Sequence, residues 1–228
     1  MDQRKELILN TIIKEHIKTG MPVGSGVLVE KYKLDVSPAT VRNDMSALEE
    51  EGFIAQPHTS AGRVPTEKAY RKYLDGLKTK RLNKSDEESL LGTIQGQSEK
   101  NYKDTAKMVS QLTSATVFWA PHKNNLFYTG ISNLFQQPEF SQLNLIYDIS
   151  SIIDRIDDIL EEEYNKFEPG LNILIGRENP FSEHCGAIIL KYQHNENDGI
   201  LGILGPMRMD YQRNIGIVEF LGDKLSKK

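Results

Sequence analysis

Cysteine and tryptophan are scarce in this sequence, which has Cys185 and Trp119 as its only examples. A single cysteine excludes a disulfide within the chain and a zinc site built from several cysteines. The adjacent His184 has no further metal ligand at a useful spacing and no base and orienting group for nucleophilic catalysis. We interpret the pair as structural, and the sequence predicts neither a metal nor a cofactor.

Long apolar runs are also lacking. No stretch approaches the roughly 20 apolar residues that a membrane-spanning helix needs. The first residues, MDQRKELILNTII, are charged and then amphipathic, unlike a secretory signal peptide. We therefore expect a cytoplasmic protein without a membrane partner.

Charge of either sign is not in large excess over the whole chain, whose net charge is −4, but it is unevenly distributed. Residues 1–81 carry 14 Lys and Arg against 11 Asp and Glu, and residues 82–228 carry 14 against 21. A basic module attached to an acidic body is typical of a DNA reader with a regulatory domain.

The stretch SPATVRNDMSALEEEGFIAQPHTSAGRVP, residues 37–65, is the most informative part of the sequence. Ser37 is a good N-cap, Pro38 suits the first helical position, and Gly52 ends the predicted helix. Its apolar face carries Val41, Met45 and Leu48 at the helical period. Its opposite face carries Ala39, Arg42, Asn43 and Ser46. Such small and polar side chains can approach base edges and phosphates closely.

Two further helices are expected before this one, over residues 3–19 and from Ser25, as its N-cap, to about 32. Leu7, Ile8, Ile12, Ile13 and Ile17 are expected on the apolar side of the first. The short connection KLDV to the third helix indicates a helix-turn-helix. Residues 53–57 and 63–65 then predict a hairpin, the wing, with Arg63 at its tip.

A capped helix beginning at Thr66 and a linker at 78–86 follow the predicted wing. The remaining sequence indicates helices at 86–114, 142–164 and 211–225, and strands at 116–122, 171–176, 185–193 and 199–206, with 126–135 less regular. Helices flanking hairpin-connected strands predict an α+β domain with an antiparallel sheet. We place the domains at 1–80 and 81–228.

Several blocks resemble the bacterial heat-inducible transcription repressor family, HrcA. They are PVGSGVLVEKYKLDVSPATVRNDMSALEEEGFIAQPHTSAGRVPTEKAYRKYLD (22–75), YTGISNLFQQPEF (128–140), IGRENP (175–180) and GILGILGPMRMDYQRNI (199–215). The resemblance implies a winged helix-turn-helix followed by a GAF-like α+β domain. It also implies a homodimer that represses chaperone genes at an inverted-repeat operator in double-stranded DNA, and a chaperonin that keeps the repressor active.

The chain departs from this family in two places. Members are typically about a hundred residues longer, and the missing stretch corresponds to a dimerising domain inserted near residues 123–125. Dimerisation must then use other surfaces, be weaker, or depend on DNA. Gly26 also stands where members commonly carry a basic residue, so one phosphate contact is in doubt.

The DNA-binding residues we predict are Ser25, Ser37, Thr40, Arg42, Asn43, Ser46 and Arg63. Arg42 can pair with guanine or a phosphate and Asn43 with an adenine edge, and the residues give no preference for which reads the base. Thr40 and Ser46 are donors to phosphates or base edges. Arg63 suits a minor groove or a phosphate, and Ser25 a phosphate at a helix N-terminus. The alternative for each is a solvent-facing, capping or turn residue.

The second domain offers little chemistry. Gly199, Gly202 and Gly205 are read as strand and turn glycines, because they do not open a helix as a phosphate loop does. Arg208, Asp210 and Tyr211 either line an effector pocket or lock a strand-to-helix turn. A ligand sensor whose winged helix binds protein is the competing function. An enzyme is not expected, since the sequence lacks a recognisable nucleophile–base pair, metal cluster or phosphate loop.

Overall fold

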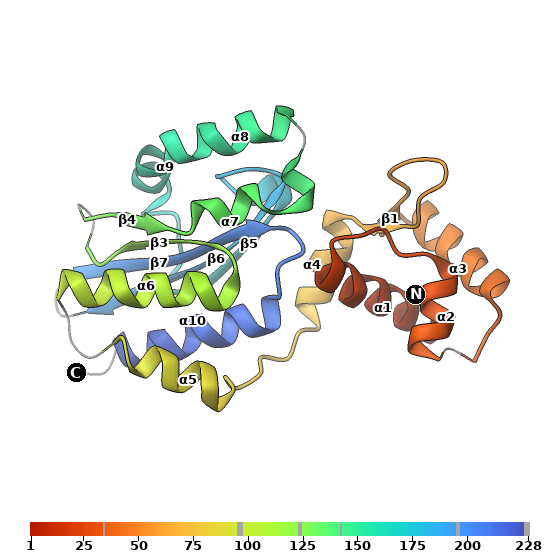
Figure 1. Cartoon of the computed structure of the whole chain (residues 1–228), viewed down its shortest axis with the longest axis horizontal. Coiled ribbons are helices and arrows are strands. Elements are labelled where there is room, and N and C mark those ends of the chain that lie inside the picture. Colours follow the sequence, from red (N-terminus) through yellow and green to blue (C-terminus); the bar gives the residue numbers. More distant parts are fainter. Residues whose placement is uncertain (34, 95–97, 123–124, 142, 195–196, 226–228) are drawn as a thin grey trace. The chain divides into compact units, whose positions relative to one another are not determined.

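In the computed structural model the chain forms two compact units, Met1–Leu77 and Lys78–Lys228 (Figure 1). The structure describes all residues except 34, 95–97, 123–124, 142, 195–196 and 226–228. Most of the site near 123–125 where an inserted domain is predicted to be missing, and the first residue of the helix predicted at 142–164, therefore lie outside the described residues.

The first unit is a winged helix-turn-helix. Its elements are α1 (Gln3–Thr19), α2 (Ser25–Tyr32), α3 (Pro38–Glu50), β1 (Ile54–Ala55), β2 (Val64–Pro65) and α4 (Glu67–Asp75). Gly20, directly after α1, and Gly52, two residues after the end of α3, take positive φ angles of 69° and 75°, a conformation that glycine adopts without strain. The predicted ends of these helices are thus confirmed.

The core of the first unit lies where the apolar faces of α1, α2 and α3 meet. The fully buried side chains include Ile8, Leu9, Ile12, Ile13, Leu28, Val41, Leu48 and Ile54. One predicted member of this face is wrong, because Leu7 is 53% exposed. Leu7 lies one position before the stripe that Ile8, Ile12 and Ile13 form, so the helical turn carries it toward solvent.

Two predicted N-caps of the first unit need correction. Gly24, not Ser25, is the N-cap of α2, and Ser25 is the first helical residue. Thr66 occupies the N-cap position of α4, but its hydroxyl donates to the carbonyls of Gly52 and Phe53, at 2.8 and 3.0 Å, instead of capping the helix. The threonine therefore ties α4 to the end of α3.

The second unit is a GAF-like α+β fold. Its helices are α5 (Lys84–Leu91), α6 (Glu99–Thr113), α7 (Ile131–Phe135), α8 (Leu143–Asp154), α9 (Ile156–Glu163) and α10 (Tyr211–Leu225), with short 3-10 turns at Pro138–Ser141 and Gly176–Glu178. Its strands are β3 (Thr116–Ala120), β4 (Phe127–Thr129), β5 (Gly170–Ile175), β6 (Cys185–His194) and β7 (Asn197–Pro206).

These strands form one antiparallel sheet in the order β4-β3-β7-β6-β5. Figure 1 shows α7, α8 and α9 over one face of the sheet and α5, α6 and α10 over the other. Side chains alternate accordingly along β3. Phe118 joins the cluster beneath α7–α9, whereas Trp119 packs against Tyr102 of α6. The fold class predicted from the sequence is confirmed.

Two long predicted helices are each divided in two. The stretch 86–114 forms α5 and α6, because Gly92 ends the first and Ser98 caps the second. α5 also begins at Lys84, so the predicted linker, 78–86, is three residues too long at its C-terminal end. The stretch 142–164 is interrupted at Arg155, between α8 and α9. The less regular stretch at 126–135 contains β4 and α7.

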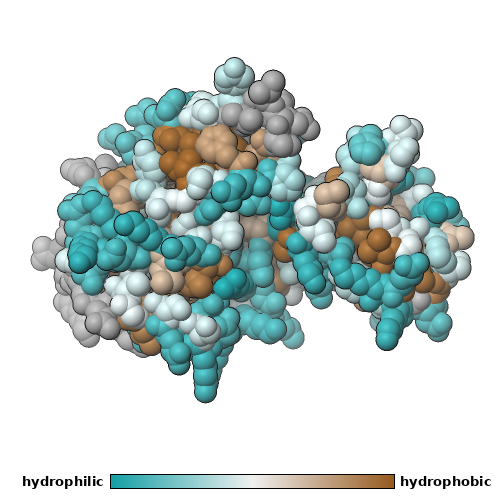
Figure 2. Space-filling model, viewed as in Figure 1, coloured by the Kyte–Doolittle hydropathy of each residue, from teal (hydrophilic) through white to brown (hydrophobic). Residues whose placement is uncertain are grey.

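The visible face of the molecule is largely hydrophilic, with apolar side chains in separate areas (Figure 2). The large apolar and aromatic side chains exposed by 39% or more include Met21, Val27, Leu91, Tyr128, Phe135 and Tyr147. No helix in the described parts of the chain is long and apolar enough to cross a membrane.

Candidate nucleic-acid interface

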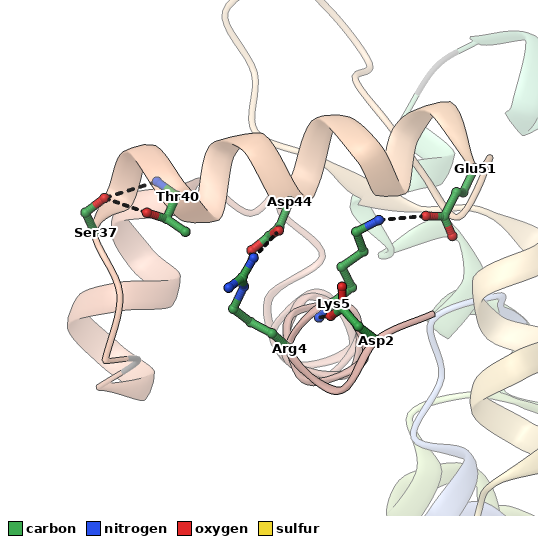
Figure 3. A network of polar contacts seen from close by, with 7 residues as sticks. All are labelled: Asp2, Arg4, Lys5, Ser37, Thr40, Asp44 and Glu51. Carbon is green, nitrogen blue, oxygen red and sulfur yellow. Dashed lines mark hydrogen bonds and ion pairs between the residues drawn. The ribbon is translucent and has the colours of Figure 1, made fainter.

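Helix α3 presents the residues predicted to read DNA. Ser37 caps it, since its hydroxyl accepts a hydrogen bond from the Thr40 amide at 3.1 Å and lies 2.9 Å from the Thr40 hydroxyl (Figure 3). The exposed face carries Ala39, Arg42, Asn43 and Ser46, and the buried face Val41, Met45 and Leu48. This division of the helix agrees with the one expected from the sequence.

Two ion pairs hold α3 against α1. The Arg4 guanidinium donates two hydrogen bonds to the Asp44 carboxylate, at 2.7 and 3.0 Å, and Lys5 donates to Glu51 at 3.0 Å (Figure 3). The Asp44 side chain is 8% exposed, so this bidentate pair is partly removed from solvent. Hydrogen bonding to Asp44 raises the pKa of the Arg4 guanidinium above its ordinary value. The pairs fix the orientation of α3 and therefore of its exposed face.

Sequence reasoning missed Asp44, although a signal was present. Asp44 lies three residues after Val41 and four before Leu48, so the helical period places it on the buried face. An aspartate at such a position needs a partner, because burying an unpaired carboxylate is unfavourable. The partner, Arg4, is 40 residues away in sequence, and only the fold identifies it.

A second polar cluster joins α1 to α2. The buried Glu15 carboxylate accepts hydrogen bonds at 2.7 Å from the Lys31 ammonium and from the Tyr32 hydroxyl. These bonds hold the pKa of Glu15 below its ordinary value. Desolvation, together with the Glu15 carboxylate, raises the pKa of Tyr32 to about 12. The cluster fixes the helix that precedes α3.

The wing is a hairpin of two very short strands, in which Ala55 pairs with Val64 and Ile54 with Pro65. Its exposed tip carries His58, Thr59 and Ser60. The expectation that Arg63 lies at this tip is wrong. Its backbone pairs with Val23, and its side chain is 17% exposed and bonded to Glu49 at 2.8 Å. Arg63 thus belongs to the base of the hairpin.

Ser25 and Gly26 begin α2, and both are half-buried. A Cβ added at Gly26 would meet nothing within 4 Å, so the fold leaves space for a side chain at this position. The phosphate contact by Ser25 stays a prediction.

The residues singled out in the second unit lie in positions that fit structural roles. Cys185 is fully buried, and burial raises the pKa of its thiol to about 12. Gly199, Gly202 and Gly205 lie within β7. Within the described residues, no group of three His, Cys, Asp or Glu side chains is suited to hold a metal ion.

The block GPMRMDY forms a locked turn between β7 and α10. Arg208 is ion-paired with Glu139 and donates to Gln137 at 2.7 Å. The Asp210 carboxylate accepts from the Arg213 amide at 3.1 Å, and Tyr211 is fully buried. Of the two interpretations left open for this block, these contacts favour the lock.

Comparison with protein families gives two matches. Residues 67–215 match the family described as HrcA protein C terminal domain, and residues 28–66 match a DeoR-like helix-turn-helix domain. A crystal structure of a hypothetical protein at 2.2 Å resolution has the same fold, with a TM-score of 0.78 and 21% sequence identity over 99% of this chain and 98% of the other.

Curated relatives carry the name heat-inducible transcription repressor HrcA. The relative from Carboxydothermus hydrogenoformans is 26% identical over 334 residues, covering 100% of this chain and 98% of its own length. The relative from Pelotomaculum thermopropionicum is 37% identical over 169 residues, covering 71% of this chain and 48% of its own. Identity rises to 60% over 79 residues in the relative from Acidothermus cellulolyticus, covering 35% of this chain and 23% of its own.

The first of these alignments spans 334 positions although the chain has 228 residues, so more than a hundred positions of that relative have no counterpart here. The expectation of a shortened member is confirmed. The match over residues 67–215, together with relatives that align with the entire chain, establishes that this chain is a member of the HrcA family and is shorter than those relatives.

Proposed function

We propose that this chain represses heat-induced genes by binding an inverted-repeat operator through its winged helix-turn-helix. The observation that carries the proposal is the geometry of α3. A capped helix, fixed to α1 by the Arg4–Asp44 pair, presents an exposed face of small and polar side chains. A helix of this kind suits the major groove, where the N-terminal part of a recognition helix meets base edges.

Arg42 and Asn43 are the side chains we assign to base reading, because both are exposed on adjacent positions of α3. Arg42 suits guanine or a phosphate and Asn43 suits adenine. Ser46 donates its hydroxyl to the Arg42 carbonyl at 3.1 Å, which leaves its oxygen as an acceptor. Ser37 and Thr40, joined at the N-terminus of α3, and Ser25, at the start of α2, are assigned to phosphates.

Residues 1–80 are assigned as the DNA-binding domain and 81–228 as the regulatory domain. Family membership supports a cytoplasmic homodimer, since two-fold symmetry in the protein matches two-fold symmetry in an inverted repeat. The same membership supports a chaperonin as the partner that keeps the repressor active. The polar character of the exposed α3 face disfavours the competing role of a protein-binding module, which calls for apolar side chains there.

Selection from a library of random duplexes tests the proposal. The wild-type chain is expected to enrich one inverted repeat, and a band-shift titration is then expected to show preference for that repeat over a scrambled duplex of equal length. Lys14→Ala, which removes an exposed positive charge from α1, serves as a control beside Arg42→Ala. Failure to enrich any symmetric sequence would contradict the proposal.

A further inference from the structure

We propose that Glu49, Gln56 and Arg63 form a wing clamp. Arg63 makes no contact with DNA itself, and it affects DNA binding by pairing with Glu49, which positions the wing. The inference rests on the proposed function and assigns three positioning residues to it. Each of the three is partly buried at the junction between α3 and the hairpin.

One carboxylate joins both sides of the hairpin to α3. Glu49 lies in the last turn of α3, where its Oε1 accepts a hydrogen bond from the backbone amide of Gln56 at 3.1 Å. Its Oε2 accepts from the Nε of Arg63 at 2.8 Å. Gln56 follows β1 and Arg63 precedes β2, so the two donors lie on opposite sides of the wing loop. The carboxylate therefore fixes the distance between the two sides and their position relative to α3.

Gln56 also shapes the loop that it begins. Its side-chain amide donates to the carbonyls of Thr59 and Ala61, both at 3.0 Å. Inside the loop, the Ala61 amide donates to the His58 carbonyl at 2.9 Å. The exposed tip is thus folded over the Gln56 side chain, whose backbone is itself bonded to Glu49.

The returning side of the hairpin is fixed at a second place. Arg63 and Val23 exchange two backbone hydrogen bonds, at 2.8 and 2.9 Å. At Gly62, an added Cβ would lie 2.5 Å from the carbonyl carbon and oxygen of Val23, so only glycine fits. With its backbone held by Val23 and its Nε by Glu49, Arg63 is oriented toward α3 and away from the tip.

The negative charge of Glu49 allows its positioning role to be distinguished from a plain charge effect on DNA binding. A carboxylate near the phosphate backbone opposes DNA binding, so its removal alone strengthens binding. Glu49 favours binding only if the position of the wing depends on it. Glu50, the next residue, is exposed and carries the same charge, which makes it a matched control.

The test measures the affinity of the full chain for the inverted repeat that the wild type selects. Glu49→Ala is expected to weaken binding by about tenfold, the size of a hydrogen bond to a charged group, whereas Glu50→Ala leaves it equal or stronger. Thermal unfolding of each variant shows whether the fold is retained. A Glu49→Ala variant that folds and binds as well as the wild type would overturn the clamp.

Arg63→Ala separates positioning from direct contact. Each phosphate contact contributes about 0.9 to the slope of log affinity against log salt concentration. We expect Arg63→Ala to weaken binding with an unchanged slope. The double variant that carries both Glu49→Ala and Arg63→Ala is expected to bind no more weakly than either single variant. A reduced slope, or additive losses, would show that Arg63 contacts a phosphate directly.

Gln56→Ala provides a variant that leaves α3 and both ionised groups intact. It removes only the two hydrogen bonds that fold the loop tip, so the protein is expected to fold and to bind the repeat several-fold more weakly. Wild-type affinity in this variant would contradict the role of the clamp at the tip. If the wild type itself selects no inverted repeat, the proposed function fails together with the clamp, whereas a normal wild type with unaffected variants overturns the clamp alone.

Discussion

Single side chains of α3 divide into those that the helical period explains and those that it does not. The exposure of Arg42 and Asn43 and the burial of Val41 follow from the period alone. The roles of Asp44 and Glu49 do not, because their partners are Arg4 and Arg63, at sequence separations of 40 and 14. Sequence patterns identify faces of a helix, whereas ion pairs between elements require the fold.

Alanine substitutions at the two positions that we assign to base reading give the first prediction at this scale. Arg42→Ala and Asn43→Ala are each expected to weaken binding to the selected repeat by about 1–3 kcal/mol and to relax the preference for one base pair. Both side chains are exposed, so the unfolding temperature is expected to stay unchanged. Titration of duplexes with each base pair replaced in turn measures the effect, and retained discrimination at every position would contradict the assignment.

The phenol of Tyr32 gives a prediction on pH. Burial of the phenol, together with its bond to the Glu15 carboxylate, raises its pKa from an ordinary 10 to about 12. The stability that depends on the neutral phenol is therefore fully present below pH 10 and is lost as the pH rises through about 12. Tyr32→Phe removes the ionisable phenol, so the variant is expected to lack this loss of stability between pH 10 and pH 12. Urea unfolding of both proteins between pH 9 and pH 12 measures the difference. Parallel curves for the two proteins would contradict it.

At the scale of elements, the sequence predicts whether a segment is a helix or a strand better than it predicts where that helix or strand begins and ends. The ends of α1 and α3 follow from two glycines and the Ser37 cap. Breaks are harder to place, because the apolar stripe of 142–164 continues through Arg155, where α8 ends and α9 begins. The division serves packing, since Ile152 and Ile156 on either side of the break are both buried in one core.

The segment 78–83 illustrates an element with no pattern of its own. The sequence predicts it as part of a linker, and it contains neither helix nor strand. Within the second unit, however, Gln212 of α10 donates to the Lys78 carbonyl at 3.0 Å. A Cβ at Gly216 would lie 2.8 Å from the Lys80 carbonyl oxygen. The segment therefore lies against α10 at a place where only glycine leaves room.

Gly216→Ala is expected to displace this segment and to speed tryptic cleavage at Lys80 and Arg81. Gly222→Ala, on the same helix, is the control, because its Cβ would meet only the flexible end of the Leu190 side chain at 3.0 Å. Alanine favours a helix over glycine by about 1 kcal/mol at either position, so the two variants differ mainly in the contact with the segment. Timed proteolysis with mass spectrometry compares them, and equal cleavage rates would contradict the expectation.

The whole molecule combines a winged helix-turn-helix with an α+β unit, in a chain shorter than its relatives. Strands β3 and β4 are neighbours in the sheet, with Trp119 opposite Phe127, at the place where the sequence predicts that an inserted domain is missing. The fold class followed from the sequence because helices flank a run of strands that are joined as hairpins. The order of the strands did not, since β3 pairs with β7 across more than eighty residues.

Sedimentation of the chain with its selected duplex tests the central claim most directly. We expect two chains to bind each inverted repeat, and we expect binding to be lost on a scrambled duplex and weakened as the salt concentration rises, because bound counterions are released from the phosphates. This result would establish a symmetric repressor that assembles without the missing residues. One chain per duplex, or equal binding to the scrambled sequence, would contradict the account.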